Sequence, residues 1–524
     1  MLAVMLDASR NGVLKTEEIK RFIDRVKIMG YDTVGIYMED VYEIDGEPYF
    51  GHLRGRYSKA ELKEINAYAK AAGMNVLPCI QTLAHLHGMF RWRQYAAIRD
   101  TDDILLIDEP QTYALIDKMF ATLRECFDCK TINIGMDEAW NVGLGAYKNK
   151  HGFTNRLDLM FRHLSKVIAI AGKYSFDCMM WSDMFFNLAG EKDDIAKYVP
   201  DNVTLCYWDY YTTSENKYCE NIEKHLCITP RTAFAGGAWT WASFAPQNGW
   251  TIKSMRPAMS ACRKYGVKDV IITLWGDDGR ECSYNAVLPS LFFCAEKYLH
   301  DTPDDRIKEK FYALFGVPFD DFMFLDLPDS IGRTKTPFNG TSSKFGLYQD
   351  SFLGQFDYHI SLGDGEACEG FADQLARVAK SAGEFAYLFE NAANLCRVLA
   401  LKYDLGVRTR KAYSEKNGKA LQDLADKVYP SVIERIEKFY QSFKKVWDTE
   451  CKPFGFEVHD HRIGGLLHRL RACRETLLSF LGGKIERIEE LEVPVLPYDD
   501  VPVRSDVRFD HRHAYAISMN REVW

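Results

Sequence analysis

The first 300 residues of the chain repeat one pattern of apolar and polar positions. Short apolar runs rich in β-branched and aromatic residues end in polar residues, and an amphipathic stretch follows each of them. This alternation is typical of parallel strands joined by crossover helices. It predicts eight strands, at 2–8, 33–40, 75–82, 131–138, 175–183, 203–211, 232–241 and 268–277.

Several of the helices predicted between these strands have residues that are typical of helix ends. A helix is predicted at 15–29, and Ser58 with Glu61 has the spacing of a capping box, with Gly73 ending that helix. Another helix is predicted at 154–171, ending at Gly172. Eight strand–helix units in about 300 residues fit a (β/α)8 barrel. A doubly wound sheet, the alternative, would show a glycine-rich phosphate loop after an early strand, and the sequence has none.

The pattern changes near residue 301, where helical periodicity replaces the strand-like runs. Helices are predicted at 367–398, 419–445 and 461–490, the segment 327–360 has the composition of a loop, and the proline-spaced tail 493–524 is expected to lie across a surface. The predicted fold class is therefore α/β: a (β/α)8 TIM barrel at 1–300 followed by a mainly α-helical C-terminal domain at 301–524.

Composition narrows the class of partner. The net charge of −8 argues against a general affinity for nucleic acid or anionic membranes, and no apolar run approaches the ~20 residues of a membrane span. The 14 cysteines sit mostly in apolar runs, and the chain starts without a basic leader or cleavage site, so a cytoplasmic location is expected. The histidine clusters at 459–461 and 510–513 lack a third partner at metal-site spacing, and we expect them to be solvated polar turns.

Functional residues of such barrels lie at the C-terminal ends of the strands. Nearly every predicted strand end carries an acid, a tryptophan or both, which suits a polyol with one apolar face. Asp137 and Glu138 are adjacent at the end of the fourth strand. Most glycosidases separate their two carboxylates by ~5–9 Å across the scissile bond, whereas an adjacent pair fits assistance by a substituent of the substrate. There are two alternatives to a catalytic adjacent pair. The two acids merely end the strand, or the catalytic carboxylates are a separated pair such as Asp40 with Glu138.

The stretch NIGMDE at 133–138 resembles the signature of glycoside hydrolase family 20, the β-N-acetylhexosaminidases. LDASR at 6–10 and QTLAH at 81–85 resemble the family's first-strand and third-strand motifs, in the same order along the barrel. The resemblance covers roughly residues 1–300 and is greatest to a bacterial cytoplasmic-type branch with a helical C-terminal domain. It implies that Glu138 is the general acid and base, that Asp137 stabilises the acetamido group, and that His85 is a relay.

The resemblance also implies a sugar-binding set drawn from most strand ends: Arg10, Glu39, Asp40, Trp181, Trp208, Tyr210, Tyr211, Trp239, Trp275 and Asp277, with Trp241 as a further candidate. The chain departs from the family pattern in three respects. Met136 stands where the family has a second glycine, and Thr240 lies near the position of a family tyrosine. Glu39 and Asp40 are both candidates to orient His85. Tyr210 or Tyr211 would then have to supply the hydroxyl that binds the acetamido carbonyl.

The expected function is a retaining exo-β-N-acetylhexosaminidase that removes terminal β-linked N-acetylglucosamine or N-acetylgalactosamine through an oxazolinium intermediate. Its expected substrate is a small oligosaccharide or glycoconjugate, with no cofactor, no metal, no nucleic acid and no membrane partner, and the C-terminal helices are a candidate homodimer interface. Two alternatives are a barrel glycosidase with separated carboxylates and a non-hydrolytic sugar-binding protein.

Overall fold

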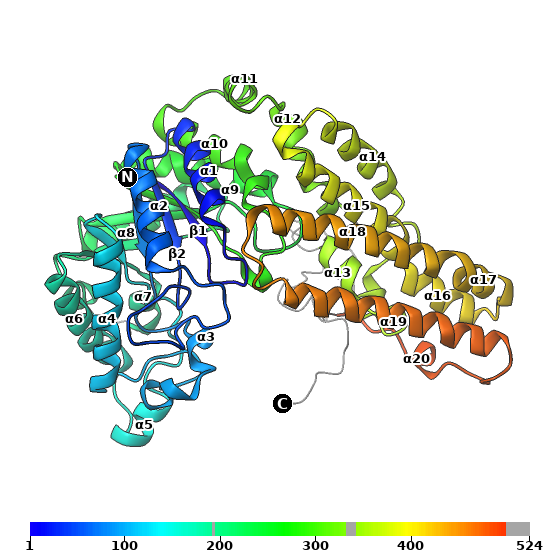
Figure 1. Cartoon of the computed structure of the whole chain (residues 1–524), viewed down its shortest axis with the longest axis horizontal. Helices are drawn as coiled ribbons and strands as arrows, with labels where there is room; N and C mark the ends of the chain where they lie inside the picture. Colours follow the sequence, from blue (N-terminus) through cyan, green and yellow to red (C-terminus); the bar gives the residue numbers. More distant parts are fainter. Residues whose placement is uncertain (191–193, 332–341, 499–524) are drawn as a thin grey trace. The chain divides into compact units, whose positions relative to one another are not determined.

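A computed structural model describes residues 1–190, 194–331 and 342–498. Eight parallel strands close into a barrel in the order β1 to β8 (Figure 1). They are β1 Leu2–Asp7, β2 Thr33–Tyr37, β3 Asn75–Cys79, β4 Thr131–Asn133, β5 Asp177–Trp181, β6 Thr204–Trp208, β7 Thr232–Gly237 and β8 Asp269–Leu274. All eight predicted strands and the (β/α)8 fold class are thereby confirmed.

The strands end earlier than the apolar pattern predicted, and β4 shows the largest difference. Its predicted range was 131–138, but the strand ends at Asn133. Gly135, Met136 and Glu138 all have positive φ angles, which no strand can accommodate. The segment that carries the acidic pair is therefore a tight irregular turn beyond the strand.

The barrel is filled by side chains from alternate strand positions. The interior cluster contains Met5, Tyr37, Leu77, Trp181 and Ile271, all at most 2% exposed. Neighbouring positions such as Val4 and Ile36 are equally buried and point to the other face. Because both faces of a parallel barrel are covered, its strands are continuous apolar runs, and this explains the pattern in the sequence.

Helices follow the strands around the barrel: α1 Thr16–Ile28, α2 Lys59–Ala71, α3 His87–Phe90, α4 Pro110–Cys126, α5 Ala146–His151, α6 Arg156–Lys173, α7 Asp183–Leu188, α8 Glu215–Ile228, α9 Asn248–Tyr265 and α10 Leu288–Leu299. Helix α2 begins with the predicted capping box, in which Ser58 accepts from the Glu61 amide and Glu61 accepts from the Ser58 amide. Gly73 follows it with φ of 75°. The prediction that Gly172 ends α6 is wrong, because the helix includes it.

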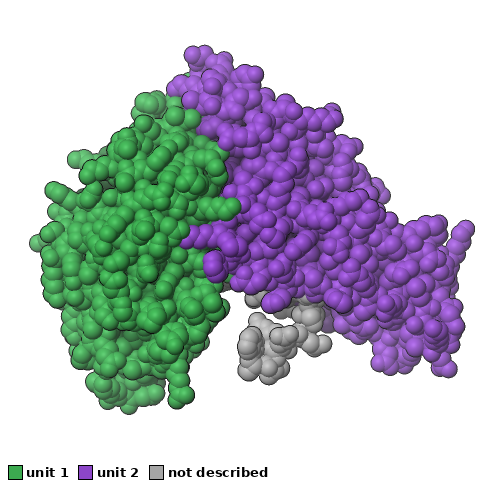
Figure 2. Space-filling model, viewed as in Figure 1, with its two compact units in different colours: residues 1–238, 251–275, 290–303 green, residues 239–250, 276–289, 304–524 purple. Residues whose placement is uncertain are grey.

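The chain divides into two compact units, coloured separately in Figure 2. The first comprises 1–238, 251–275 and 290–303, and the second comprises 239–250, 276–289 and the chain from 304 onward. The predicted domain boundary at residue 300 lies three residues before the end of the first unit. Two segments that follow β7 and β8 are thus grouped with the second unit.

The second unit is mainly helical: α11 Asp304–Phe315, α12 Phe319–Phe322, α13 Ser342–Tyr348, α14 Ala367–Ala379, α15 Ala386–Lys402, α16 Leu405–Ser414, α17 Gly418–Asp423, α18 Tyr429–Glu450, α19 Glu457–Leu481 and α20 Glu489–Glu492. The predicted helix 367–398 is two helices, separated by a turn at Gly383. The predicted helix 419–445 is α17 and α18, joined by a π-helical turn at 424–428. Part of the predicted loop 327–360 is helix α13.

Helix α19 corrects two further expectations. The predicted helix 461–490 begins at Glu457 and ends at Leu481, where Gly482 and Gly483 follow. His459 lies inside it, fully buried, so the prediction of a solvated turn at 459–461 is wrong. Its Nε2 lies 2.8 Å from the Gly279 carbonyl oxygen, and burial lowers the pKa of His459 to about 4. The histidine cluster at 510–513 and most of the tail 493–524 lie outside the described residues.

Within the described ranges, no helix combines the length and apolar character that a membrane span requires.

The capping box of α2 yields a stability prediction. Replacing Ser58 by Ala leaves the Glu61 amide without its acceptor, which should lower the free energy of unfolding by about 1 kcal/mol. Ser165→Ala is the matched control, because Ser165 lies mid-helix in α6 and bonds to the Phe161 carbonyl. Urea unfolding followed by circular dichroism measures both variants. Equal stability of the two variants would contradict this role of Ser58.

Candidate active site

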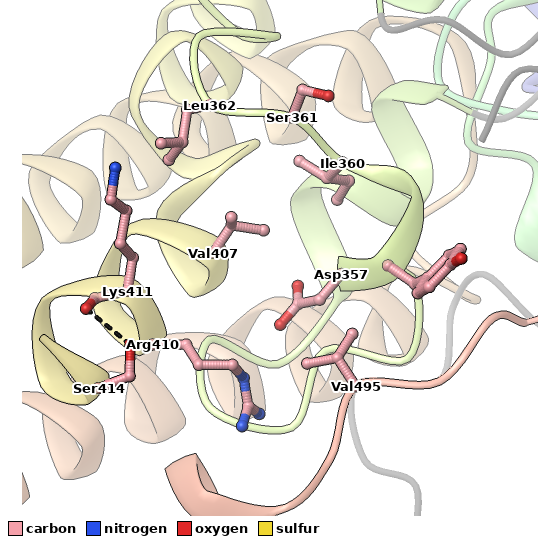
Figure 3. A pocket seen from close by; sticks show the side chains of 10 residues that line it. Asp357, Ile360, Ser361, Leu362, Val407, Arg410, Lys411, Ser414 and Val495 are labelled. Atoms are coloured by element: carbon pink, nitrogen blue, oxygen red, sulfur yellow. Dashed lines mark hydrogen bonds between the residues drawn. The ribbon is translucent and has the colours of Figure 1, made fainter.

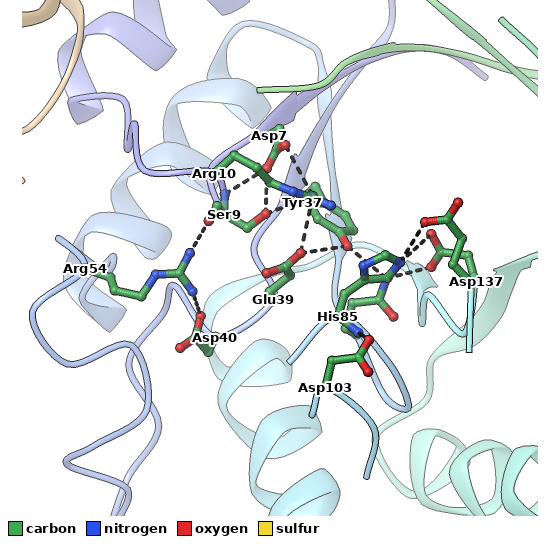
Figure 4. A network of polar contacts seen from close by, with 12 residues as sticks. Asp7, Ser9, Arg10, Tyr37, Glu39, Asp40, Arg54, His85, Asp103 and Asp137 are labelled. Carbon is green, nitrogen blue, oxygen red and sulfur yellow. Dashed lines mark hydrogen bonds and ion pairs between the residues drawn. The ribbon is translucent and has the colours of Figure 1, made fainter. Parts of the chain in front are cut away.

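Polar side chains from β1, β2, β3 and β4 converge just beyond the strand ends (Figure 4). Neighbouring strands place them there: Cys79 of β3 pairs with Asn133 of β4, so the residues that follow both strands share one end of the barrel. Asp137 belongs to this group and is buried.

Two neighbours hold the Asp137 carboxylate. Gln81 Nε2 donates to its Oδ1 at 2.6 Å, and His85 Nε2 lies 3.3 Å from its Oδ2. Burial alone would raise the pKa of Asp137, but the His85 charge and the hydrogen bonds from His85 and Gln81 outweigh it and lower that pKa. Asp137 is therefore ionised although it is buried.

Gln81 also fixes the turn that presents the acidic pair. Its Oε1 accepts from the Met136 amide at 3.1 Å, and its Nε2 also donates to the Tyr37 hydroxyl at 2.9 Å. A Cβ atom at Gly135 would lie 2.2 Å from Gln81 Oε1, so the turn requires glycine there. Met136 has φ of 71°, a conformation that costs a non-glycine residue about 1–2 kcal/mol. Met136 is therefore strained at the position where the family pattern has a second glycine.

Glu138 differs sharply from its neighbour in exposure. Its side chain is 46% exposed, and its Oε2 lies 3.7 Å from His85 Nε2. The backbone amide of Glu138 donates to Asp183 Oδ2 at 3.0 Å. One nitrogen of His85 thus lies near both carboxylates, one buried and one open to substrate.

His85 is held in place by its own backbone. It has φ of 58°, and its amide donates to Asp103 Oδ2 at 3.3 Å. Burial would lower the pKa of His85, but the Asp137 charge and hydrogen bond raise it to about 9. The imidazole is therefore a cation at neutral pH.

The structure separates the roles of Glu39 and Asp40. Asp40 is buried and is bound by Arg54. Glu39 accepts from the Tyr37 hydroxyl at 3.1 Å and pairs with Arg10 at 3.3 Å, and its charge helps to raise the pKa of His85. Glu39 is therefore the member of the pair that acts on His85, through charge.

Arg10 projects from the end of β1 between acids and rings. Its Nη1 lies 3.3 Å from carboxylate oxygens of both Asp7 and Glu39. Its guanidinium carbon lies 5.1 Å from the Tyr37 ring centroid and 5.3 Å from that of Trp275. The Arg10 side chain is 23% exposed.

Aromatic rings from β5, β6 and β8 form a connected group. Trp275 Nε1 donates to the Tyr210 hydroxyl at 3.1 Å, and the Trp208 and Tyr210 rings stack with centroids 5.4 Å apart. The centroids of Trp181 and Trp275 are 6.3 Å apart. Tyr211, in contrast, is 50% exposed, and Tyr210 is buried. The structure therefore brings Trp181, Trp208, Tyr210 and Trp275 together.

Trp239, Trp241 and Asp277 belong to the second unit. Trp239 is buried, and its ring stacks on that of Trp241 with centroids 4.4 Å apart. Asp277 begins the 3-10 helix Asp277–Gly279. Their contact with a sugar stays a prediction.

Asp183 has a part in the site that the sequence analysis did not assign. Burial and the neighbouring Asp137 charge raise the pKa of Asp183 to about 7. It accepts from the Glu138 backbone amide while its own pKa lies well above the usual range for aspartate. The position of Asp183, two residues after Trp181, was visible in the sequence, but its partner, the Glu138 amide beyond the end of β4, was not. Among the described residues, no cluster of three or more histidine, cysteine, aspartate or glutamate side chains could hold a metal ion.

The chain is similar to several known proteins. Hexosaminidase D from Bos taurus is 21% identical over 327 residues, covering 56% of this chain and 90% of that protein. Hexosaminidase D from Homo sapiens is 24% identical over 333 residues, covering 58% and 66%. The crystal structure of an exo β-N-acetylglucosaminidase from Vibrio harveyi, 15% identical, covers 62% of this chain and 58% of its own, with a TM-score of 0.47.

Two family models match separate parts of the chain. The glycoside hydrolase 20C C-terminal domain matches residues 320–508. The catalytic domain of glycosyl hydrolase family 20 matches residues 3–269, which is more than half of the chain and includes the acidic pair. The chain therefore belongs to glycosyl hydrolase family 20.

Proposed function

We propose that this chain is a retaining exo-β-N-acetylhexosaminidase that removes terminal β-linked N-acetylglucosamine or N-acetylgalactosamine from small oligosaccharides or glycoconjugates. Family membership and the two curated relatives named hexosaminidase D support the activity. The observation that carries the proposal is the difference between two adjacent acids. Asp137 is buried and ionised, whereas Glu138 is exposed and close to the same histidine.

In the first step, Glu138 donates its proton to the departing glycosidic oxygen. The acetamido oxygen of the substrate attacks C1 as the C1–O bond breaks, and an oxazolinium ion forms. Asp137 accepts a hydrogen bond from the acetamido N–H and stabilises the positive charge that develops there. A buried carboxylate stabilises such a charge strongly because little water screens it.

In the second step, Glu138 acts as the base. It removes a proton from water, which attacks C1 and reopens the ring, so that the acetamido group is restored. Two displacements at the same carbon give overall retention of configuration. His85 supports both steps, because its positive charge lies near both carboxylates and keeps Asp137 ionised.

The remaining side chains bind the sugar. Arg10, which is partly exposed, binds ring hydroxyls, and the partly exposed rings of Trp208 and Trp275 bind the sugar face and the acetamido methyl group, with the buried Trp181 packed behind Trp275. We assign the hydroxyl that binds the acetamido carbonyl to Tyr210, because it already bonds to Trp275, whereas Tyr211 is half exposed. The fourteen cysteines are all free thiols, which supports the proposal of a reducing, cytoplasmic location.

The geometry disfavours a separated pair of Asp40 and Glu138. Asp40 is 1% exposed and its Oδ1 is bound by Arg54, so its carboxylate is not accessible to a water molecule or an anomeric carbon. A non-hydrolytic sugar-binding protein is distinguished by assay: release of 4-nitrophenol from its N-acetyl-β-glucosaminide supports the enzyme, and no release refutes it.

The two acids should respond differently to substitution. Glu138→Gln removes proton donation and should slow substrates with poor leaving groups most severely, since good leaving groups need little protonation. Asp137→Asn removes charge stabilisation and should slow good and poor leaving groups alike. Steady-state rates on a series of aryl glycosides measure both effects. Rates near wild type in both variants would show that the roles are wrongly assigned.

Gln81 is predicted to act through Asp137 as a positioning residue. Gln81→Leu keeps the approximate volume but removes the 2.6 Å bond to Asp137, which should lower kcat about tenfold to a hundredfold. It should also raise the pKa of Asp137, so that the acidic limb of the activity profile moves to higher pH. Tyr37→Phe is the control, because it removes the other partner of the same amide nitrogen. An unmoved acidic limb in Gln81→Leu would contradict this role.

The ion pair between His85 and Asp137 predicts a pH window. The pKa of His85 is raised from 6.5 to about 9, so the stabilisation is complete below pH 6.5 and is lost as the pH rises through 9. The pKa of Asp137 is lowered, so its contribution is lost only when the pH falls below the usual range for aspartate.

NMR titration of labelled histidine should show His85 near 9 in the wild type and clearly lower in Asp137→Asn. His163, whose pKa burial lowers to about 4, should not respond and serves as the internal control. A wild-type His85 that titrates near 6.5 would refute the ion pair.

A further inference from the structure

A cavity of about 620 Å³ lies within the second unit, and its side chains are drawn in Figure 3. Three segments line it: the connection between α13 and α14, helix α16, and the chain that follows α20. Its lining residues are Asp357, Tyr358, Ile360, Ser361, Leu362, Val407, Arg410, Lys411, Ser414 and Val495. Small-molecule sites in proteins have volumes of about 300–1,000 Å³, so the cavity has the size of such a site.

Asp357 is a buried acid without a hydrogen-bond partner. It is 5% exposed, and neither of its carboxylate oxygens has a donor among the described residues. Figure 3 shows the carboxylate pointing into the space between Val407 and Val495. Burial raises the pKa of Asp357 to about 7 against the opposing charges of Arg410 and Lys402. Buried polar groups are nearly always hydrogen-bonded, so a carboxylate placed in this way indicates an absent donor.

The terminal nitrogens of the nearby cations Arg410 and Lys402 are hydrogen-bonded elsewhere, and Arg410 Nε, like Asp357, has no partner among the described residues. The terminal nitrogens of Arg410 donate to the carbonyl oxygens of Leu491 at 2.7 Å, Val493 at 2.8 Å and Phe352 at 2.6 Å. Lys402 Nζ donates to the Gln349 carbonyl oxygen at 2.6 Å. These cations hold backbone segments around the cavity and do not hydrogen-bond to Asp357.

The backbone leaves a defined place for the carboxylate. A Cβ atom at Gly354 would lie 2.3 Å from Asp357 Oδ1, and one at Gly406 would lie 3.1 Å from it. Both positions are glycines, so the main chain approaches the acid closely without displacing it. The backbone therefore leaves room for the Asp357 carboxylate, but no described residue donates a hydrogen bond to it.

The charges and surfaces of the cavity select a class of ligand. The ionised form of Asp357 repels an anion, and Arg410, Lys411 and the nearby Lys402 disfavour a cation. A neutral ligand with several hydroxyl groups satisfies both limits, since it donates to Asp357 without adding charge. Ser361 offers a further hydroxyl partner and Ser414 an acceptor, since the Ser414 hydroxyl donates to the Lys411 carbonyl, while Ile360 and Val407 contact apolar C–H faces. We propose that this cavity is a second, non-catalytic site for a neutral saccharide, with Asp357 accepting hydrogen bonds from its hydroxyls.

Lactose tests this proposal by saturation-transfer NMR on the full chain. Lactose lacks an acetamido group, so it reports on the cavity independently of the proposed barrel site. We expect transfer to lactose in the wild type, at least about tenfold weaker binding in Asp357→Asn, and loss of binding in Leu362→Trp, which fills the exposed rim. Asp423→Asn, the same change at the half-exposed C-terminal residue of α17, should bind as the wild type does.

Three results would overturn the proposal. They are no transfer in the wild type, unchanged binding in both cavity variants, and binding of protonated glucosamine but not lactose, which would make the cavity a cation site. Hydrolysis of the chromogenic N-acetylglucosaminide should stay within twofold of wild type in the cavity variants. A protein that binds lactose through Asp357 but releases no nitrophenol would retain the second site and refute the proposed function instead.

Discussion

The active centre depends on keeping one buried carboxylate ionised. Removing Asp137 from water favours its neutral form, and the donors Gln81 and His85 reverse that preference. The neighbouring groups are consistent with this constraint. His85 becomes a stable cation, and Asp183, which faces the same charge, has its pKa raised to about 7. Asp137 could not stabilise the developing charge of an oxazolinium ion if it were protonated, so the proposed chemistry requires this arrangement.

The barrel supplies the arrangement through strand order and one strained turn. Because β3 and β4 are neighbours, Gln81 and His85 at the end of one meet Asp137 beyond the end of the other. Gly135, Met136 and Glu138 adopt positive φ angles, and these turn adjacent residues in different directions. Asp137 can thereby be buried while Glu138, its direct neighbour, faces solvent. A regular strand would separate the two side chains but would not set their distances to a shared histidine.

The sequence predicted the eight strands because each is a continuous apolar run, and it predicted that acids and tryptophans gather at their ends. It could not predict where the strands stop, because polar residues beyond β4 resemble a strand tip until their φ angles are known. The roles of Gln81 and Asp183 depend on partners across the sheet, which no local pattern reveals. Glu39 and Asp40 could not be distinguished from sequence, since only the structure shows that Arg54 binds Asp40 while Glu39 lies where its charge acts on His85. His459 was misjudged because its flanking polar residues concealed a buried face of α19.

The most direct test of the account compares two substrates that differ at a single position. We propose kcat/KM measurements on 4-nitrophenyl N-acetyl-β-glucosaminide and on 4-nitrophenyl β-glucoside, which carries a 2-hydroxyl in place of the acetamido group. An intramolecular nucleophile held beside C1 has a very high effective concentration, so the first substrate should exceed the second by at least about a thousandfold. Comparable values for the two substrates would contradict participation of the acetamido group, and with it the role assigned to Asp137.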